Sequence, residues 1–306
     1  MIAVVLNARS GRGTASEAPR RIRELCEEAG RAVQVATASG KAIERAARKA
    51  VAEGCELLVA GGGDGTIGTV AGIAAEAGIP FGVLPLGTRN HFARDLGIPL
   101  ELDGAMQVVL AGQTRKVDLG EVNGRVFINN SSLGVYPRLV RFRERLRQYG
   151  LAKWAAALWA LLAVLRAHPF MAVRITADGE AMVRRTPFVF IGNNEYRMEG
   201  LSAARRESLS DGVLALYVMN ASGRRSLLWL GWQILRGRTA ELSELEVFQV
   251  AEAEVELRRR SPHVALDGEL VPLRGVLRYR VRPGALSVCA PAPVPAPEDE
   301  SVSAAT

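Results

Sequence analysis

The stretch Leu57-Leu58-Val59-Ala60-Gly61-Gly62-Gly63-Asp64-Gly65-Thr66-Ile67 decides how this chain folds. Its apolar start predicts a buried strand, and its glycines predict a turn that leaves the strand. Glycine lets backbone N–H groups approach phosphate oxygens without a Cβ in the way, and a helix that begins after the turn adds its positive dipole end. Asp64 would repel phosphate unless a divalent cation lies between them. The stretch therefore predicts a polyphosphate site that includes a metal ion.

Strands and helices alternate on both sides of this turn. We expect strands at 2–6, 32–36, 57–60 and 80–84, and helices around 16–29, 41–53 and 68–77. Such alternation favours a doubly wound α/β domain with a mostly parallel sheet, whose ligands bind at the carboxyl ends of the strands. The loops that follow the first, third and fourth strands should therefore meet at one edge of the sheet.

The pattern changes after about Lys116. The later segments are short, often alternate in polarity and are separated by Asn, Asp or Gly, which predicts an antiparallel β domain with strands at 116–122, 125–129, 172–177, 186–191, 212–219, 244–250 and 254–258. Helices are expected near 138–149, 152–165 and 226–235. The Pro- and Ala-rich tail, 291–306, is expected to be disordered.

Composition sets limits on function without choosing one. The chain has 306 residues, a net charge of +7 and a pI near 9.8, which suits an anionic substrate, a nucleotide, a membrane surface or a nucleic acid. The arginine excess is equally consistent with genome composition. The three cysteines are scattered, so neither a zinc site nor a disulfide framework is expected. The N-terminus runs straight into a strand pattern without a signal peptide, which predicts a cytoplasmic protein.

Four motifs occur in an order that resembles the lipid kinase family of diacylglycerol and sphingosine kinases: Asn7 to Gly13, Gly62 to Thr66, Pro85 to Asn90, and Asp267-Gly268-Glu269. The Gly-Gly-Asp-Gly-Thr core also occurs in NAD kinases and, in variant form, in phosphofructokinases. The Pro-Leu-Gly-Thr loop and the late Asp-Gly-Glu match the lipid kinases. The resemblance implies an ATP-binding α/β domain over 1–118, a lipid-binding β-sandwich over 119–281, and a last strand, 282–290, that returns to the first domain.

The resemblance also implies roles for individual residues. Nucleotide contacts fall on Asn7, Ser10, Thr37, Gly62, Gly63, Asp64, Gly65, Thr66, Gly87, Thr88 and Asn90. Asp64 and Asp118 would hold the catalytic Mg²⁺, directly or through water, and Glu269 would accept the proton of the lipid hydroxyl as general base. Phosphoryl transfer has a loose transition state, so positioning and electrostatics would supply most of the acceleration.

A second, structural Mg²⁺ is implied at Asp211, with carbonyl groups from Ser208 and Val213. A plain Asp-Gly turn explains Asp211 equally well. The chain also departs from the family pattern: Ala8 stands where Pro is usual, His91 replaces an Asp after Asn90, and the glycine-rich stretch before Asp211 is reduced to Gly200. Substrate preference can therefore differ from that of better-known members.

Segment 151–170 is the most hydrophobic part of the chain. It is too short and too interrupted by charge to span a bilayer, which takes about 20 apolar residues. One interpretation is an interfacial helix that feeds lipid to the cleft, and the other is a helix packed on the β domain.

We therefore expect an ATP- and Mg²⁺-dependent kinase that phosphorylates a hydroxyl of a membrane lipid, most simply diacylglycerol. Such an enzyme would sit peripherally at the inner face of the membrane and bind no nucleic acid, and a homodimer is left open. The enzymatic alternative is an NAD kinase or another small-molecule kinase on the same scaffold. The non-enzymatic alternative is a regulator that binds ATP without turnover, against which the presence of Asp64, Asp118 and Glu269 argues.

Overall fold

The computed structural model describes residues 1–10, 17–134, 170–177, 179–197, 205–206, 208–219, 245–257 and 263–292. The helices expected near 138–149, 152–165 and 226–235 lie outside these residues, as do Gly200, nearly all of the hydrophobic segment 151–170 and most of the tail. Those predictions remain predictions. Within the described ranges, no helix combines the length and apolar character needed to cross a membrane.

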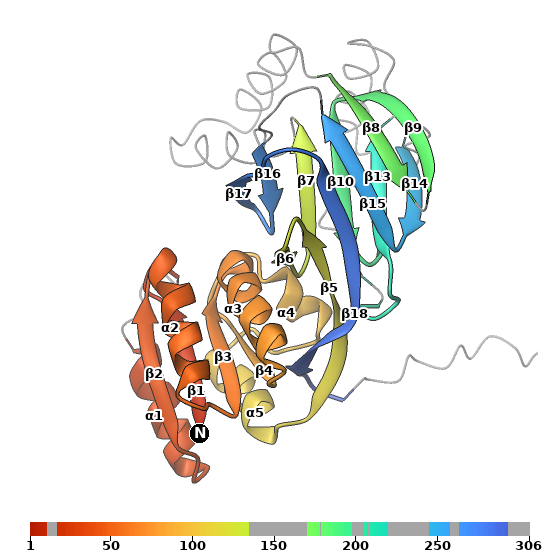
Figure 1. Ribbon diagram of the computed structural model, residues 1–306. Coiled ribbons are helices and arrows are strands. Elements are labelled where there is room, and N and C mark those ends of the chain that lie inside the picture. The colour runs from red at the N-terminus through yellow and green to blue at the C-terminus, as the bar shows by residue number, and fades with distance from the viewer. Residues whose placement is uncertain are drawn as a thin grey trace, which may run out of the picture.

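The N-terminal part alternates strands and helices, as the sequence predicts. Four parallel strands lie in the order β2-β1-β3-β4, with bounds β1 (Ile2–Asn7), β2 (Val33–Ala38), β3 (Leu57–Gly62) and β4 (Phe81–Pro85). Helix α2 packs beside α3 and α1 packs beside α5 (Figure 1), with bounds α1 (Ala18–Glu28), α2 (Lys41–Ala52), α3 (Asp64–Ala77) and α5 (Leu102–Ala111). The expected α/β domain is confirmed.

Helix α3 begins at Asp64 rather than at Gly68, where the sequence pattern predicted it. Glycine disfavours helix, but the glycines of α3 lie where other parts of the chain approach closely. A Cβ on Gly65 would lie 2.5 Å from the Glu269 carboxylate, and one on Gly68 would lie 2.7 Å from that of Asp267. Close packing therefore overrides propensity, and it draws Asp64 into the first turn of the helix, where a negative charge is favourable.

The C-terminal part is a sandwich of two antiparallel layers. One layer continues the first sheet through β5 (Thr114–Val122), β6 (Arg125–Phe127), β8 (Met171–Ala177), β9 (Glu180–Thr186), β15 (Glu252–Leu257) and β18 (Leu277–Cys289). The other contains β7 (Asn130–Gly134), β10 (Phe188–Asn193), β13 (Leu214–Met219), β14 (Leu245–Val250), β16 (His263–Leu266) and β17 (Glu269–Pro272). A separate apolar core fills the space between the layers, which confirms the β-sandwich.

Strand β18 belongs to both parts of the molecule (Figure 1). Its start pairs with β15 in the sandwich, and its end runs parallel to β4 at Val288 and Phe81. The strand expected over 282–290 is therefore part of a longer strand that begins at Leu277. An irregularity between Arg282 and Leu286 lets one continuous strand follow β5 through both domains.

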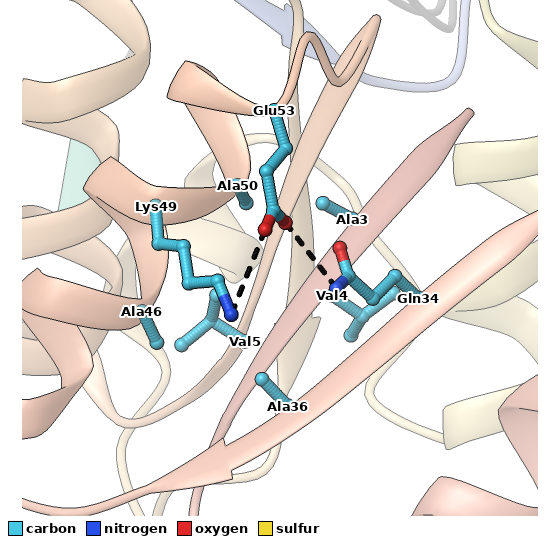
Figure 2. Close-up of a pocket in the computed structure, with 9 residues that line it drawn as sticks. All are labelled: Ala3, Val4, Val5, Gln34, Ala36, Ala46, Lys49, Ala50 and Glu53. Atoms are coloured by element: carbon cyan, nitrogen blue, oxygen red, sulfur yellow. Dashed lines mark hydrogen bonds and ion pairs between the residues drawn. The ribbon is translucent and has the colours of Figure 1, made fainter.

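A cavity of about 90 Å³ lies between α2 and the strands β1 and β2 (Figure 2). Glu53 accepts a hydrogen bond from Gln34 at 3.4 Å and pairs with Lys49 at 3.5 Å across it. The cavity contains none of the predicted phosphate-site residues, and a nucleotide needs several times its volume. We assign it to incomplete packing among small side chains, with a lining of Ala3, Val4, Val5, Gln34, Ala36, Ala46, Lys49, Ala50 and Glu53.

Candidate active site

Three loops meet at the carboxyl edge of the parallel sheet. Asn7, at the end of β1, donates from Nδ2 to the Thr66 hydroxyl at 2.8 Å, while its Oδ1 accepts from the Arg9 backbone at 3.0 Å. Gly87 approaches Gly63 so closely that a Cβ on Gly87 would lie 2.4 Å from the Gly63 Cα. The loops after β1, β3 and β4 therefore lie against one another at this edge of the sheet.

The remaining predicted contact residues lie at the same edge. The Ser10 backbone donates to the Asn7 carbonyl at 3.0 Å. Thr37 pairs with Leu6 inside β2 rather than following that strand, because β2 continues to Ala38. Thr88 is exposed on the loop after β4. The structure thus gathers all the predicted contact residues around one edge of the sheet.

Asn90 shapes its loop from within. It is 5% exposed and adopts a left-handed backbone conformation, with φ of 52°. Its side-chain oxygen accepts from the Gly87 backbone at 3.0 Å, and its amide donates to the Pro85 and Gly87 carbonyls, both at 2.9 Å. Since these bonds use its amide fully, we interpret Asn90 as a support for the loop rather than a direct contact to a ligand.

Asp64 lies at the centre of the arrangement. Its Oδ1 accepts from the Phe92 backbone and from the Asn129 side chain, both at 3.2 Å, and its Oδ2 accepts from the His91 backbone at 3.3 Å. The residues His91 and Phe92 begin the short helix α4 (His91–Asp95). A carboxylate has about four lone-pair sites, and Asp64 is partly exposed. It is therefore fixed in place with capacity left for a further partner.

Glu269 reaches this site from the far end of the chain. It begins β17 just after a two-residue turn, Asp267-Gly268, in which both residues have positive φ (47° and 87°), as a tight hairpin requires. The hairpin β16–β17 faces the α/β domain (Figure 1), and the Glu269 side chain lies against the Cα of Gly65. A solvent-accessible carboxylate is thereby placed beside the first turn of α3, the helix that begins at Asp64.

Asp267 holds this hairpin in position. Its carboxylate accepts three backbone hydrogen bonds, from Ile128 at 2.9 Å, Asn129 at 2.7 Å and Asn130 at 3.1 Å. Burial raises the pKa of Asp267 to about 7, even though these N–H groups act to lower it, and the nearby charge of Asp64 raises it further. Asp267 therefore clamps the hairpin onto the segment that joins β6 and β7.

Asp267→Asn is expected to flatten the pH dependence of stability between about pH 4 and pH 7. The folded protein keeps the Asp267 proton up to a pKa of about 7, whereas the unfolded chain loses it near 3.8. The folded state therefore binds more protons between these values, and the free energy of unfolding falls as pH rises, by on the order of 1 kcal/mol per pH unit. Urea denaturation at several pH values measures this, and parallel profiles for the two proteins would contradict it.

Asp118 has a different environment from Asp64. It is 2% exposed, and its two oxygens accept short bonds from the backbones of Gly212 and Gly284, both at 2.7 Å. These bonds tie β5 to the start of β13 and to the irregular turn of β18. Asp118 shares no hydrogen-bond partner with Asp64 among those that the structure describes. Its observed role is to link three strands.

The predicted Mg²⁺ sites fit these residues unequally. Asp64 suits a Mg²⁺ ligand because it is a partly exposed carboxylate with an unused lone pair, while Asp118 suits direct coordination less because it is buried. Over the described ranges, no three His, Cys, Asp or Glu side chains gather in a way that could hold a metal.

The second, structural Mg²⁺ site was predicted at Asp211, with carbonyl groups of Ser208 and Val213. Asp211 is exposed, and the Val213 carbonyl accepts a hydrogen bond from the Asn194 backbone at 3.0 Å. The Ser208 hydroxyl accepts a hydrogen bond from the Ser210 backbone. Both Mg²⁺ sites remain predictions.

Sequence reasoning missed two residues that support the site, Asn129 and Arg206. Asn129 donates to Asp64, and Arg206 binds Asn129 from the other side at 2.7 Å. The only sequence signal for Asn129 was its place at the polar end of an expected strand. Arg206 carried no signal for this role, because its partners are distant in sequence.

Comparisons with known proteins agree with this arrangement. The diacylglycerol kinase catalytic domain family matches residues 1–122, and the YegS C-terminal NAD kinase beta sandwich-like domain matches residues 134–290. The chain is 33% identical to the Pseudomonas aeruginosa protein named "Probable lipid kinase YegS-like" over 95% of both chains. It is 32% identical to a diacylglycerol kinase of Mycobacterium tuberculosis over 68% of this chain and 69% of that one.

A solved structure shares the whole fold. The crystal structure of a diacylglycerol kinase from Bacillus anthracis superposes with a TM-score of 0.71 over 95% of this chain and 96% of that chain. At 19% sequence identity this likeness concerns the fold alone. With the two domain matches and the relatives of 30% identity and above, it leads to one conclusion: the chain is a kinase, and it belongs to the lipid kinase family of diacylglycerol kinases and YegS-like proteins.

Proposed function

We propose that this kinase transfers the γ-phosphoryl group of ATP to a hydroxyl of a membrane lipid, with diacylglycerol, giving phosphatidic acid, as the simplest acceptor. The observation that carries the proposal is the position of Glu269, whose carboxylate lies against Gly65 in the first turn of α3. A carboxylate from the β domain thereby faces the glycine turn of the α/β domain. This is the relation that a general base needs to a bound polyphosphate.

The nucleotide would lie along the carboxyl edge of the parallel sheet. Backbone N–H groups of 62–66 and of Thr88 would bind its phosphates, because the glycines there carry no Cβ and α3 directs its positive end toward them. The N–H of Gly87 is already bound to Asn90. Asn7 and Asn90 would hold the two loops in shape through the bonds that they make within the protein. Ser10, Thr37 and Thr88 would complete the contacts at the edge.

The chemical step needs one proton acceptor. The lipid hydroxyl would give its proton to the Glu269 carboxylate as its oxygen forms a bond to the γ-phosphorus, while the bond from that phosphorus to the bridging oxygen breaks and ADP leaves. Glu269 is suited to this because it is exposed and lies at a hairpin that Asp267 holds in place. When bound, Mg²⁺ would neutralise phosphate charge, with Asp64 as the ligand that fits best.

The acceptor would reach the site from a membrane surface. The net charge of +7 favours contact with anionic lipid headgroups, and the acceptor itself is insoluble in water. We therefore place the enzyme peripherally at the cytoplasmic face of the membrane.

Incubation with labelled ATP, Mg²⁺ and mixed micelles that contain diacylglycerol, sphingosine or phosphatidylglycerol, with NAD in a parallel sample, tests this proposal. Label in a lipid, with diacylglycerol the expected acceptor, would support it, and mass analysis of a phosphorylated total lipid extract would identify the natural acceptor. Label in NAD but in no lipid would point to the small-molecule alternative. Label nowhere, with ATP bound, would point to a nucleotide-binding regulator.

A further inference from the structure

Arg206 is a buried cation at the junction of the two domains. Its side chain is 0% exposed, and its Nε donates to Asp95 Oδ2 at 2.8 Å. Its Nη1 donates to the Ile128 carbonyl at 2.7 Å and to that of Asn193 at 3.1 Å, and its Nη2 donates to Asn129 Oδ1 at 2.7 Å. The guanidinium also lies over the Tyr196 ring, 5.3 Å from its centre. A buried charge with this many partners fixes the geometry of each of them.

The contact with Asn129 determines which way that amide faces. Arginine carries only donors, so the Asn129 atom that faces Nη2 must be the oxygen. The Asn129 nitrogen is then turned the other way and donates to Asp64 Oδ1 at 3.2 Å. In the flipped orientation, two oxygens would face each other at Asp64 and two donors would face each other at Arg206. Arg206 therefore ensures that Asp64 meets a donor.

The contact with Asp95 acts on Asp64 through helix α4. Asp95 is the last residue of α4, and its side chain is 6% exposed. The first two backbone N–H groups of the same short helix, those of His91 and Phe92, donate to Asp64. Arg206 thus holds both of the groups that donate to Asp64, namely the Asn129 amide and the start of α4.

We propose that Arg206 is a positioning residue for Asp64: through Asn129 and Asp95 it fixes the direction of the Asp64 carboxylate in the phosphate site. The inference rests on the proposed function only in that Asp64 serves Mg²⁺ and the nucleotide there. Because Arg206 belongs to β12 (Arg205–Arg206) and Asp64 to α3, this ring of hydrogen bonds also makes the geometry of the phosphate site depend on how the β domain is seated.

Arg206→Lys tests the proposal, because one ammonium group cannot reach Asp95 and Asn129 together. We expect the Mg²⁺ concentration for half-maximal activity to rise about tenfold and kcat to fall about tenfold, as for other residues that orient a metal ligand, with the KM for lipid unchanged. Arg184→Lys is the matched control, since Arg184 is a partly exposed arginine that binds Glu246 at 3.1 Å within the β-sandwich. It should keep wild-type kinetics.

A second variant, Asn129→Ala, tests the same role in case Arg206→Lys does not fold. Asn129→Ala removes the donor to Asp64 but leaves Arg206 with Asp95 and two carbonyls. It should show the same change in Mg²⁺ dependence. Since the two residues act in series, the double variant should be no worse than the more impaired single variant. A lowered melting temperature with unchanged kcat and Mg²⁺ dependence per folded molecule would make Arg206 merely structural and overturn the proposal.

Measurement of nucleotide binding tests the positioning role of Arg206 independently of the proposed lipid kinase activity. If the wild type phosphorylates no lipid, the proposed function fails, and the positioning role is then judged by calorimetry with Mg²⁺ and the non-hydrolysable analogue β,γ-imido-ATP. Affinity reduced about tenfold in Arg206→Lys and in Asn129→Ala, but not in Arg184→Lys, would support the positioning role. Equal affinities in all four proteins, or no binding to the wild type, would overturn it.

Discussion

Asp64→Ala is expected to lower kcat/KM for ATP about 10³-fold while the protein stays folded. The carboxylate is the group at the glycine turn that best fits a Mg²⁺ ligand, and loss of a preorganised electrostatic contact to a transferring group has effects of about this size. Asp64 also accepts from His91 and Phe92 at the start of α4, so a stability loss of about 1 kcal/mol should accompany the change. Steady-state kinetics and urea denaturation of the same preparation measure both effects.

The control for Asp64 is Asp103→Ala. Asp103 also lies in the first turn of a helix in the α/β domain, where it binds Arg21 at 2.7 Å on the surface. The Asp103→Ala substitution removes a carboxylate from the first turn of a helix, as Asp64→Ala does, but at a position remote from the predicted phosphate site. Its activity should therefore stay near that of the wild type. If Asp64→Ala retained full activity while folded, Asp64 would have no part in catalysis.

Glu269→Gln is expected to lower kcat by about 10²- to 10⁴-fold, the range for removal of a general base, with little change in ATP affinity. Glutamine keeps the size of the side chain at the start of β17 but cannot accept the hydroxyl proton. Glu252→Gln, an exposed carboxylate at the start of β15, is the matched control and should keep wild-type rates. Single-turnover transfer to lipid, together with nucleotide binding, separates the chemical step from substrate affinity.

Gly65→Ala tests the position of Glu269 rather than its charge. The new methyl group would lie 2.5 Å from Glu269 Oε1, 2.8 Å from its Cδ and 2.9 Å from its Cγ. A flexible, exposed side chain can move away at small cost in stability, but the carboxylate would then leave the first turn of α3. We expect kcat to fall well over tenfold with the melting temperature little changed. Wild-type kcat in this variant would show that the contact with Gly65 is unimportant.

Much of the fold could be predicted because its signals are local. The apolar run 57–60 with its glycine turn, and the alternation of strands and helices around it, predicted the α/β domain and the edge at which we expect phosphate to bind. The Asp267-Gly268 turn before Glu269 also rests on a local signal, since Asp-Gly is a dipeptide that readily adopts the two positive φ angles of a tight hairpin. Where local sequence preference and tertiary packing agree, the sequence pattern alone predicts the structure.

The rest depends on contacts between distant residues. The start of α3 was placed too late because Gly65 and Gly68 disfavour helix, and only the approach of Glu269 and Asp267 explains them. Strand β7 is polar, with the sequence Asn-Ser-Ser-Leu-Gly, and gave no strand signal although it lies between β10 and β16. The pairing of Arg206 with Asp95 joins segments that no sequence period relates.

In the proposed mechanism, Glu269 and the glycine turn of Asp64 form a single phosphoryl-transfer site. The most direct test of this mechanism is the transfer of labelled γ-phosphate from ATP to diacylglycerol micelles by the wild type and by Glu269→Gln, with ATP binding measured on both proteins. We expect labelled lipid from the wild type, almost none from the variant, and equal ATP binding by both proteins. Labelled lipid at the same rate from both proteins, or no labelled lipid from the wild type, would contradict it.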